Sequence, residues 1–320
     1  MKASIVITCY NLGAYLEEAL ESACRTTYPD TEIIVVDDGS TDPDTHFVLN
    51  TLQDRYRDTE QIHFLSQENQ GLSAARNFGI RHACGECILP LDADNRLQAS
   101  YIEKAVHVLK GNRNVGVVYG WAELFGSQTG IREYPDIDLQ EMLLGNQVDA
   151  CAVFRKSVWE DIGGYDTERF REGYEDWDFW LGALERGWRF HRLPEVMFDY
   201  RVRPGSMVSA CNEPAIRQKL VTQLIEKHNE LYASCWPELL VRRELTTLAY
   251  EKAVAGYHQR YVESLAEFHA FAKQWDERVT NAEQIIQDQR TKLHHLRYEL
   301  LVAEWRDRLI ARVRRALGRA

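Results

Sequence analysis

The sequence predicts an α/β fold, in which a mostly parallel sheet is flanked by helices, followed by an all-helical C-terminal extension. Over the first half of the chain, short runs rich in β-branched residues alternate with amphipathic stretches, which is the pattern of βα units. After Pro214 helix-forming residues dominate, and only Pro237 and Gly256 interrupt a long stretch of them. We therefore expect a sheet-based domain over residues 1–210 and a helical region over residues 211–320.

The alternation assigns each element in turn. Residues 4–9 form a short apolar run typical of a buried strand, and residues 14–24 place Leu16, Leu20 and Ala23 on one face of a helix. The same reasoning gives strands at 32–36, 62–65, 87–91 and 115–119, and helices at 46–56, 73–83 and 101–109. The less regular part beyond Trp121 gives a strand at 148–154, a helix carrying Trp177, Trp180, Leu181 and Leu184, and short strands near 189–191 and 196–200.

Composition excludes several classes of protein. The chain has 320 residues, of which 45% are hydrophobic and 11% aromatic, so it can bury a core and is not mainly disordered. Its formal charge is 38 − 49 = −11, and an acidic chain lacks the basic surface that binds nucleic acid, so no nucleic-acid partner is expected. No run approaches the roughly 18 apolar residues that span a bilayer, and the first strand is not a signal peptide, so we expect a cytoplasmic protein.

The seven cysteines do not form a recognisable framework. They are scattered and odd in number, which argues against disulfides. Cys84 and Cys87 form a C-x-x-C, but no second pair stands at zinc-binding spacing. We interpret them as incidental thiols rather than as a zinc or redox site.

The C-terminal extension carries two further patterns. Residues 279–300 follow a partial heptad, which predicts either packing onto the same chain or pairing with a second copy in a homo-oligomer. Residues 301–320 hold six arginines, and Trp305 shares a helical stripe with Leu309 and Val313. Arginines meet anionic headgroups while Trp and Leu enter the acyl boundary, so this segment is either a peripheral membrane contact or a solvated terminal helix.

Acidic residues directly follow two of the expected strands. Asp37 and Asp38 close the second strand, and Asp92 and Asp94 follow the fourth. Ligands of an open α/β sheet bind outside the carboxyl ends of the strands, so these acids should face a ligand. Carboxylates this close repel one another unless a cation or donor groups neutralise them, and the Asp-x-Asp pair therefore predicts a hard divalent cation. A helix N-cap or a turn is the alternative use of the same residues.

Together with their neighbours, these acids form a recognisable combination of motifs. The motifs are T-C-Y-N (8–11), V-V-D-D-G-S-T-D (35–42), N-Q-G-L-S-A-A-R-N (69–77), L-D-A-D (91–94) and Y-E-D-W-D (174–178). In this order and at this spacing the chain resembles the family 2 glycosyltransferases, whose fold is the nucleotide-sugar-binding GT-A fold. The likeness covers about residues 1–205 and implies an inverting transfer of a sugar from a nucleoside diphosphate, most simply UDP, to an acceptor hydroxyl.

The resemblance implies how the donor nucleotide is bound. Tyr10 would stack on the nucleobase, with Thr8 nearby, and Asp38 would accept hydrogen bonds from the base. Arg76, on a helix facing the diphosphate, would help to hold the nucleotide.

The resemblance also implies a metal and a cationic contact at the diphosphate. Asp94 would ligate Mn²⁺ or Mg²⁺, and Asp92 would contact the ribose or the water shell of the ion. Arg203, after the last expected strand, would close over the diphosphate, and strand alternation would point only one of Arg201 and Arg203 inward.

Asp176 matches the position of the family's general base, which removes the proton from the acceptor hydroxyl. Its pKa is expected to be ordinary, about 3.9, so that the carboxylate is ionised at neutral pH. Glu175 points about 100° away on the same helix and is expected to bind substrate instead. Trp177 would stack on the acceptor sugar, although Trp177 and Trp180 at helical spacing are also typical of a core.

The resemblance implies an acceptor on a growing surface glycan or a lipid-linked oligosaccharide, and the absence of a Q-x-x-R-W motif favours a non-processive enzyme. Two other classes stay open. A nucleotidyltransferase would grip a triphosphate with a glycine-rich basic loop after the first strand, whereas residues 8–13 have one glycine and no basic residue. An inactive nucleotide-sugar-binding scaffold would not need the intact acids Asp38, Asp92, Asp94 and Asp176.

Overall fold

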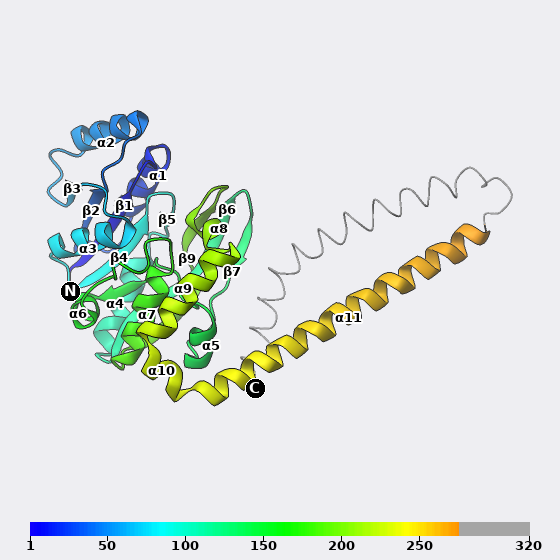
Figure 1. Cartoon of the computed structure of the whole chain (residues 1–320). Coiled ribbons are helices and arrows are strands. Elements are labelled where there is room, and N and C mark those ends of the chain that lie inside the picture. Colours follow the sequence, from blue (N-terminus) through cyan, green and yellow to red (C-terminus); the bar gives the residue numbers. More distant parts are fainter. Residues whose placement is uncertain (275–320) are drawn as a thin grey trace. The chain divides into compact units, whose positions relative to one another are not determined.

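The computed structural model describes residues 1–274, and the chain divides into two compact units, Met1–Ser234 and Cys235–Ala320. The first unit contains every candidate site residue named above (Figure 1). The partial heptad at 279–300 and the arginine-rich residues 301–320 lie outside the described residues.

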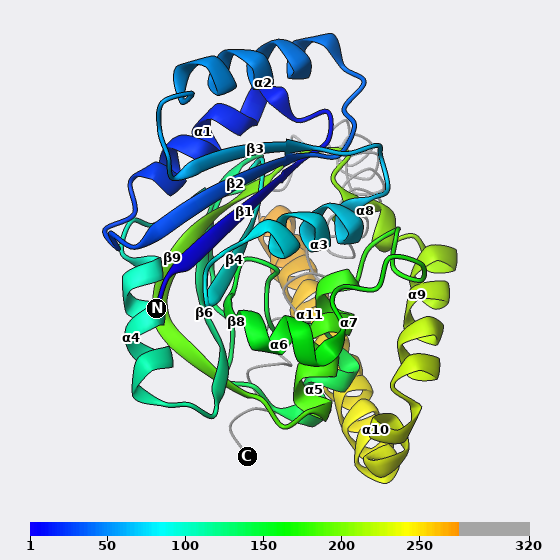
Figure 2. The same ribbon diagram turned by 90° about the vertical axis from the view of Figure 1, so that its left-hand side faces the viewer.

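A nine-stranded sheet forms the first unit, in the order β3-β2-β1-β4-β8-β6-β9-β5, with β7 paired to β6 (Figures 1 and 2). Its strands are β1 (Ala3–Cys9), β2 (Thr31–Asp37), β3 (Ile62–Ser66), β4 (Cys87–Asp92), β5 (Arg96–Leu97), β6 (Val115–Gly126), β7 (Gly130–Arg132), β8 (Val153–Arg155) and β9 (Arg189–Val202). The first four strands are parallel, whereas β8 is antiparallel to both of its neighbours. β9 is parallel to β6 and antiparallel to β5, so the sheet is mixed.

Helices flank the sheet and continue after it. They are α1 (Gly13–Cys24), α2 (Pro43–Arg55), α3 (Leu72–His82), α4 (Tyr101–Gly111), α5 (Leu139–Leu144), α6 (Lys156–Ile162), α7 (Glu175–Glu185), α8 (Met207–Cys211), α9 (Pro214–Lys227) and α10 (Asn229–Ser234). α3, α6 and α7 lie on the face of the sheet turned toward the viewer in Figure 2. β1 and β2 are buried along their whole lengths, as expected for strands that are covered on both faces.

One glycine lets α3 approach β1 closely. A Cβ atom at Gly79 would lie 2.4 Å from Cγ1 of Val6 and 3.0 Å from Cγ2 of Val36. Any larger residue would therefore push α3 away from the sheet. This close contact matters for the site because Arg76 lies one turn earlier on the same helix.

The structure corrects four of the expected strands. The strand expected at 148–154 is confined to β8, and residues 148–152 are not a strand. The strand expected at 115–119 continues to Gly126, and the two short strands near 189–191 and 196–200 are the single strand β9. β6 and β9 pair along almost their whole lengths, with irregularities near Gly120 and Trp121. Pairing between distant segments therefore lengthens both strands beyond what local patterning predicts.

The C-x-x-C runs from Cys84, in the turn after α3, to Cys87, the first residue of β4, and a buried carboxylate holds this turn. Glu32 is 2% exposed, and its Oε1 accepts hydrogen bonds from the backbone N–H groups of Cys84 (2.6 Å) and Gly85 (3.1 Å). Ser4 donates its hydroxyl hydrogen to the same oxygen, and Lys2 pairs with Oε2 at 2.7 Å. No disulfide links the cysteines within residues 1–274.

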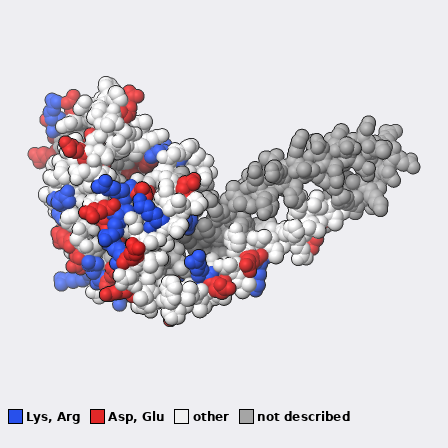
Figure 3. Space-filling view, viewed as in Figure 1, with Lys and Arg blue, Asp and Glu red and all other residues white. Residues whose placement is uncertain are grey.

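The described part of the second unit is the single helix α11 (Trp236–Gln274). Among residues 1–274, no helix combines the length and the apolar character that crossing a bilayer requires. On the face of the first unit seen in Figure 3, acidic and basic side chains are interspersed.

Candidate active site

The carboxyl ends of the parallel strands meet at one rim of the sheet. Thr8 of β1 is in register with Val36 of β2 and with Asp92 of β4, and Cys9 is in register with Asp37. The residues that follow β1, β2 and β4 are therefore neighbours in space. The T-C-Y-N, D-D-G-S and L-D-A-D motifs all come to this rim.

The turn after β1 leaves one aromatic ring exposed. Asn11 has a positive φ of 53°, and its side-chain oxygen accepts hydrogen bonds from the backbone N–H groups of Thr41 (2.8 Å) and Asp42 (2.9 Å). Tyr10 is 44% exposed, so its ring is available for stacking. Thr8 is buried, and its Oγ1 has no hydrogen-bond partner within residues 1–274. A buried hydroxyl without a partner is compatible with a ligand atom at this rim.

Asp38 accepts hydrogen bonds from the loop that leads into α3. Its Oδ1 accepts hydrogen bonds from Nε2 of Gln67 (2.7 Å) and the backbone N–H of Gln70 (3.0 Å), and its Oδ2 accepts one from the backbone N–H of Gly71 (2.9 Å). Asn69 donates to the backbone oxygen of Asp38 at 3.0 Å. With 3% exposure and three of its acceptor positions filled, Asp38 fixes the loop that leads into α3.

Arg76 joins two of the motifs. It is 1% exposed, and its Nη2 lies 2.8 Å from Oδ1 of Asp92 while its Nη1 lies 2.7 Å from Oε1 of Glu175. Arg76 was expected to hold the nucleotide; instead its guanidinium neutralises two carboxylates. Glu175 is buried in this contact, so it is an internal partner of Arg76 and not an exposed substrate contact. The Asp-x-Asp motif and the first turn of α7 are thereby tied together.

The second acid of the Asp-x-Asp motif is paired with a cation of the chain. Nε of Arg203 lies 2.7 Å from Oδ2 of Asp94. Burial and the charge of Asp92 raise the pKa of Asp94, and Arg203 offsets this only in part. Arg201 also reaches the segment, because its Nε donates to the backbone oxygen of Asp94 at 3.0 Å and its backbone N–H donates to Oδ1 of Asn95 at 2.9 Å. The expectation that only one of the two arginines points inward is therefore wrong, because residues two apart along a strand lie on the same face.

The residues present fit a divalent ion held jointly by the chain and a diphosphate. No cluster of three or more His, Cys, Asp or Glu residues that could hold a metal occurs within residues 1–274. Asp92 and Asp94 supply two carboxylates in one motif, and burial and the charge of Asp92 raise the pKa of Asp94, an effect that a nearby cation would oppose. Mg²⁺ is commonly bound by one or two carboxylates with substrate phosphates as the remaining ligands.

Asp176 lies on the first turn of α7 and is held by two donors. Nδ2 of Asn146 lies 2.8 Å from its Oδ2, and the backbone N–H of Trp177 lies 2.7 Å from its Oδ1. Burial raises the pKa of Asp176 well above its ordinary value, with further contributions from the charges of Glu175 and Asp149. The expected ordinary pKa is therefore wrong, because the sequence did not reveal how many acids surround this carboxylate.

The tryptophans of α7 belong to the core. Trp177 is 5% exposed, and its indole N–H donates to the backbone oxygen of Met142 at 2.7 Å. Trp180 is fully buried, and its indole N–H donates to the backbone oxygen of Val148 at 3.1 Å. The expected stacking of Trp177 on an acceptor sugar is corrected, since the ring faces the protein interior.

Two residues of the irregular segment were missed by the sequence reasoning. Asn146 orients Asp176, as described above, and Asp149 accepts hydrogen bonds from the backbone N–H of Cys151 (2.9 Å) and the hydroxyl of Tyr134 (3.3 Å). Both precede β8, whose antiparallel pairing with β4 brings its amino end to the carboxyl end of β4. Polar residues just before this short strand were the available signal.

Known proteins share both the sequence pattern and the fold. Residues 4–163 match the family described as Glycosyl transferase family 2. The uncharacterized glycosyltransferase YwdF of Bacillus subtilis is 29% identical over 239 residues, which cover 71% of this chain and 84% of YwdF. The UDP-Gal:alpha-D-GlcNAc-diphosphoundecaprenol beta-1,3-galactosyltransferase of Escherichia coli is 25% identical over 62% of this chain and 74% of that enzyme.

Two groups of solved structures show the fold. Staphylococcus aureus TarS 1–349 in complex with UDP-GlcNAc superposes with a TM-score of 0.55 at 20% identity, covering 73% of each chain. The mannosyltransferase PcManGT of Pyrobaculum calidifontis, in complex with GDP-Man and Mn²⁺, gives a TM-score of 0.51 at 18% identity over 74% of this chain and 75% of that one. The fold is the GT-A fold expected from the motifs. The match over half of the sequence establishes that this chain belongs to glycosyl transferase family 2 and is a glycosyltransferase.

Proposed function

We propose that the chain is an inverting, metal-dependent glycosyltransferase that moves a sugar from UDP to a hydroxyl of a lipid-linked or surface-glycan acceptor. The single observation that carries the proposal is the double contact of Arg76 with Asp92 and Glu175. This contact supports a common centre in which Asp94 and Asp176, each next to one of these acids, act on the same donor.

The donor nucleotide is proposed to lie along the rim of the sheet. Tyr10 offers its exposed ring to the base, and the unpartnered hydroxyl of Thr8 is available to the nucleoside. Asp38 acts indirectly, because it holds the 67–71 loop next to the base site. UDP is proposed because the TarS structure contains UDP-GlcNAc and the name of the E. coli relative specifies UDP-Gal.

Mn²⁺ or Mg²⁺ is proposed to be held by Asp94 and Asp92 together with the diphosphate, as the Mn²⁺ of the PcManGT complex suggests. When bound, the ion would offset the charge that develops on the departing nucleoside diphosphate. Arg203 forms an ion pair with Asp94 in this structure. Once the ion binds Asp94, Arg203 would leave this pair and contact the diphosphate.

Asp176 is proposed to be the general base. As it takes the proton of the acceptor hydroxyl, the hydroxyl oxygen bonds to the anomeric carbon and the bond from that carbon to the diphosphate oxygen breaks. Attack from the face opposite the leaving group inverts the anomeric centre. A raised pKa makes Asp176 a stronger base than an ordinary aspartate, provided that it is ionised at the working pH.

The acceptor is proposed to be presented at a membrane. The E. coli relative acts, by its name, on a diphosphoundecaprenol-linked sugar. The six arginines and Trp305 of residues 301–320 would favour contact with an anionic bilayer carrying such an acceptor.

The proposal is tested with the variant Asp176→Asn. Because asparagine has nearly the same shape but cannot take a proton, turnover of UDP-sugars should fall by roughly 10²- to 10⁴-fold while affinity for UDP with Mn²⁺ stays near that of the wild type. A panel of UDP-, GDP- and dTDP-sugars identifies the donor, and calorimetry measures UDP binding. Asp58→Asn is the matched control, because it makes the same change at an exposed aspartate between α2 and β3. Near-normal turnover of Asp176→Asn would discard the assignment of the base.

A further inference from the structure

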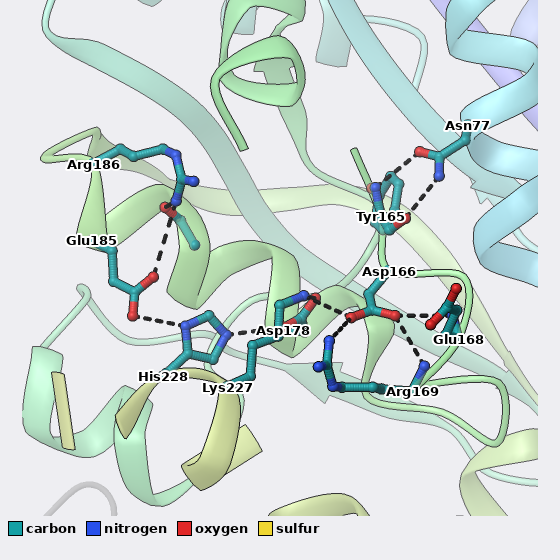
Figure 4. Close-up of polar contacts among 11 residues, drawn as sticks. Asn77, Tyr165, Asp166, Glu168, Arg169, Asp178, Glu185, Arg186, Lys227 and His228 are labelled. Carbon is teal, nitrogen blue, oxygen red and sulfur yellow. Dashed lines mark hydrogen bonds and ion pairs between the residues drawn. The ribbon is translucent and has the colours of Figure 1, made fainter. Parts of the chain in front are cut away.

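The end of α9 is bonded to the helix that carries Asp176. Nζ of Lys227 lies 2.8 Å from Oδ2 of Asp178, and Nε2 of His228 lies 3.0 Å from Oδ1 of the same carboxylate (Figure 4). Asp178 is 1% exposed and stands two residues after Asp176 on α7. Side chains two residues apart on a helix point about 200° apart, so Asp178 anchors the side of α7 opposite to the base.

Both nitrogens of the His228 ring face carboxylates. Nδ1 lies 2.8 Å from Oε1 of Glu185, while Nε2 contacts Asp178. A neutral imidazole has one N–H donor and one acceptor, so both contacts are hydrogen bonds only when the ring carries two protons. Burial lowers the pKa of His228, but the hydrogen bonds to Asp178 and Glu185 outweigh it and raise the pKa above the ordinary 6.5. The geometry therefore calls for an imidazolium.

The same cluster reaches the helix that carries Arg76. Nζ of Lys227 also lies 3.0 Å from Oδ2 of Asp166, whose other oxygen accepts two backbone hydrogen bonds within its own loop. The backbone N–H and oxygen of Tyr165 are both bonded to the side chain of Asn77, at 2.9 and 2.8 Å (Figure 4). Asn77 follows Arg76 on α3, so one set of contacts connects α9, α7 and α3.

We propose that Lys227 and His228 are positioning residues for sugar transfer, and that a doubly protonated His228 links Asp178 to Glu185 and fixes the orientation of α7. The inference rests on the proposed role of Asp176 as the base. The charged groups that face His228 are Asp178 and Glu185 on α7, with Lys227 beside it at the end of α9. Arg186 approaches Glu185 to 4.0 Å from the other side.

The pH dependence follows from the sign of the shift. A histidine whose pKa is raised by folding contributes fully below its unfolded pKa, about 6.5, and its contribution is lost as the pH rises through the folded pKa. Above that pH, one ring nitrogen presents a lone pair to a carboxylate. At the end of α9, the contact of Lys227 with Asp178 and one hydrogen bond of His228 then remain, while the second His228 contact is lost, so kcat should fall on the alkaline side while donor affinity stays the same.

His228→Gln tests the inference, with His107→Gln at an exposed position of α4 as the matched control. A glutamine makes one of the two contacts and does not titrate, so we expect kcat to fall about tenfold, with KM for the donor within about twofold. In the dependence of kcat on pH, the wild type and His107→Gln should both show a fall on the alkaline side. This fall should be absent from His228→Gln.

Asp178→Asn keeps the shape of the contact and removes its charge. The pKa of His228 should fall toward its ordinary value, so the alkaline limb of kcat should move to lower pH. NMR on the full chain follows the titration of the His228 ring, whose resonance is assigned because it is missing from His228→Gln. This measurement does not depend on enzyme activity, and it should show the same downward shift of the His228 pKa in Asp178→Asn. A wild-type His228 pKa at or below about 6.5, or an unchanged profile in Asp178→Asn, would overturn the proposal. Failure of the wild type to bind UDP would instead reject the proposed function and leave the NMR result standing.

Discussion

The reactivity of Asp176 depends on the balance between the acids and the donors around it. Burial and the charges of Glu175 and Asp149 raise its pKa, whereas Arg76 and the backbone N–H of Trp177 lower it. Two of these residues, Asp149 and Arg76, come from segments far from Asp176 in the sequence. The motif therefore pointed to the proposed base, but the direction of its pKa shift could only be inferred once the fold had brought Asp149 and Arg76 to it.

In the variant Asn146→Ala, the acidic limb of the dependence of kcat/KM on pH should move to higher pH. The amide of Asn146 donates to the ionised form of Asp176, and loss of a donor to a carboxylate raises the pKa of that carboxylate. If Asp176 is the base, as proposed, activity falls as the pH drops through its pKa. In Asn146→Ala we expect this loss at higher pH, with kcat about tenfold lower because Asp176 is less well oriented. Measurement of kcat/KM against pH tests this, with Asn114→Ala at an exposed position as control. Identical acidic limbs in both variants would contradict the assigned role of Asn146.

At the scale of elements, the parallel half of the sheet could be predicted because each strand is a compact apolar run followed by its own helix. The bounds of β8 could not be predicted in this way. Its three residues form a strand because they pair antiparallel with β4 and β6, which come from distant parts of the chain. The same pairing places Asn146 at the rim. Periodicity showed that α7 is amphipathic, but it could not show which side of the helix Trp177 occupies.

Glu32→Gln should destabilise the end of the sheet opposite to the site. Burial raises the pKa of Glu32, but hydrogen bonds from Lys2, Ser4 and the backbone of Cys84 outweigh it and lower the pKa. The stabilisation is therefore present above the unfolded pKa, about 4.3, and is lost as the pH falls through the lower folded value. We expect the free energy of unfolding to drop by about 1–3 kcal/mol at pH 7, with a smaller difference near pH 3.

Urea unfolding of Glu32→Gln at several pH values measures this effect. Glu86→Gln is the matched control, because that side chain is 66% exposed and pairs with the N-terminal amine at the long distance of 3.5 Å. A loss of stability that is the same at every pH would show that Glu32 acts through its shape and not through its charge.

At the scale of the whole molecule, composition and contacts place the domain boundary differently. Residues after 214 share a helix-forming composition, so the sequence assigns them to the C-terminal extension. The first compact unit nevertheless extends to Ser234, because α9 and α10 carry side chains that bond to it. Lys227 and His228 contact α7, and the hydroxyl of Tyr232 donates to the backbone oxygen of Leu143 at 2.9 Å. The end of the first unit therefore depends on a few specific contacts, which amino-acid composition does not reveal.

Two truncations should separate these boundaries. A fragment of residues 1–234 keeps every contact named above, and we expect it to fold cooperatively and to bind UDP with the affinity of the full chain. A fragment of residues 1–210 leaves Asp178 without Lys227 and His228, and breaking a buried ion pair in this way typically costs about 3–5 kcal/mol. This fragment should unfold at a much lower temperature or remain aggregated.

Thermal unfolding and calorimetric UDP binding of both fragments measure the difference. Lys227→Met and His228→Gln, combined in the 1–234 fragment, should reproduce part of the loss, because they remove both positive charges next to Asp178 without shortening the chain. Equal melting temperatures for 1–210 and 1–234 would mean that α9 and α10 add nothing to the catalytic unit. In that case the boundary lies where the composition changes, and the orientation of α7 is set within the first 210 residues.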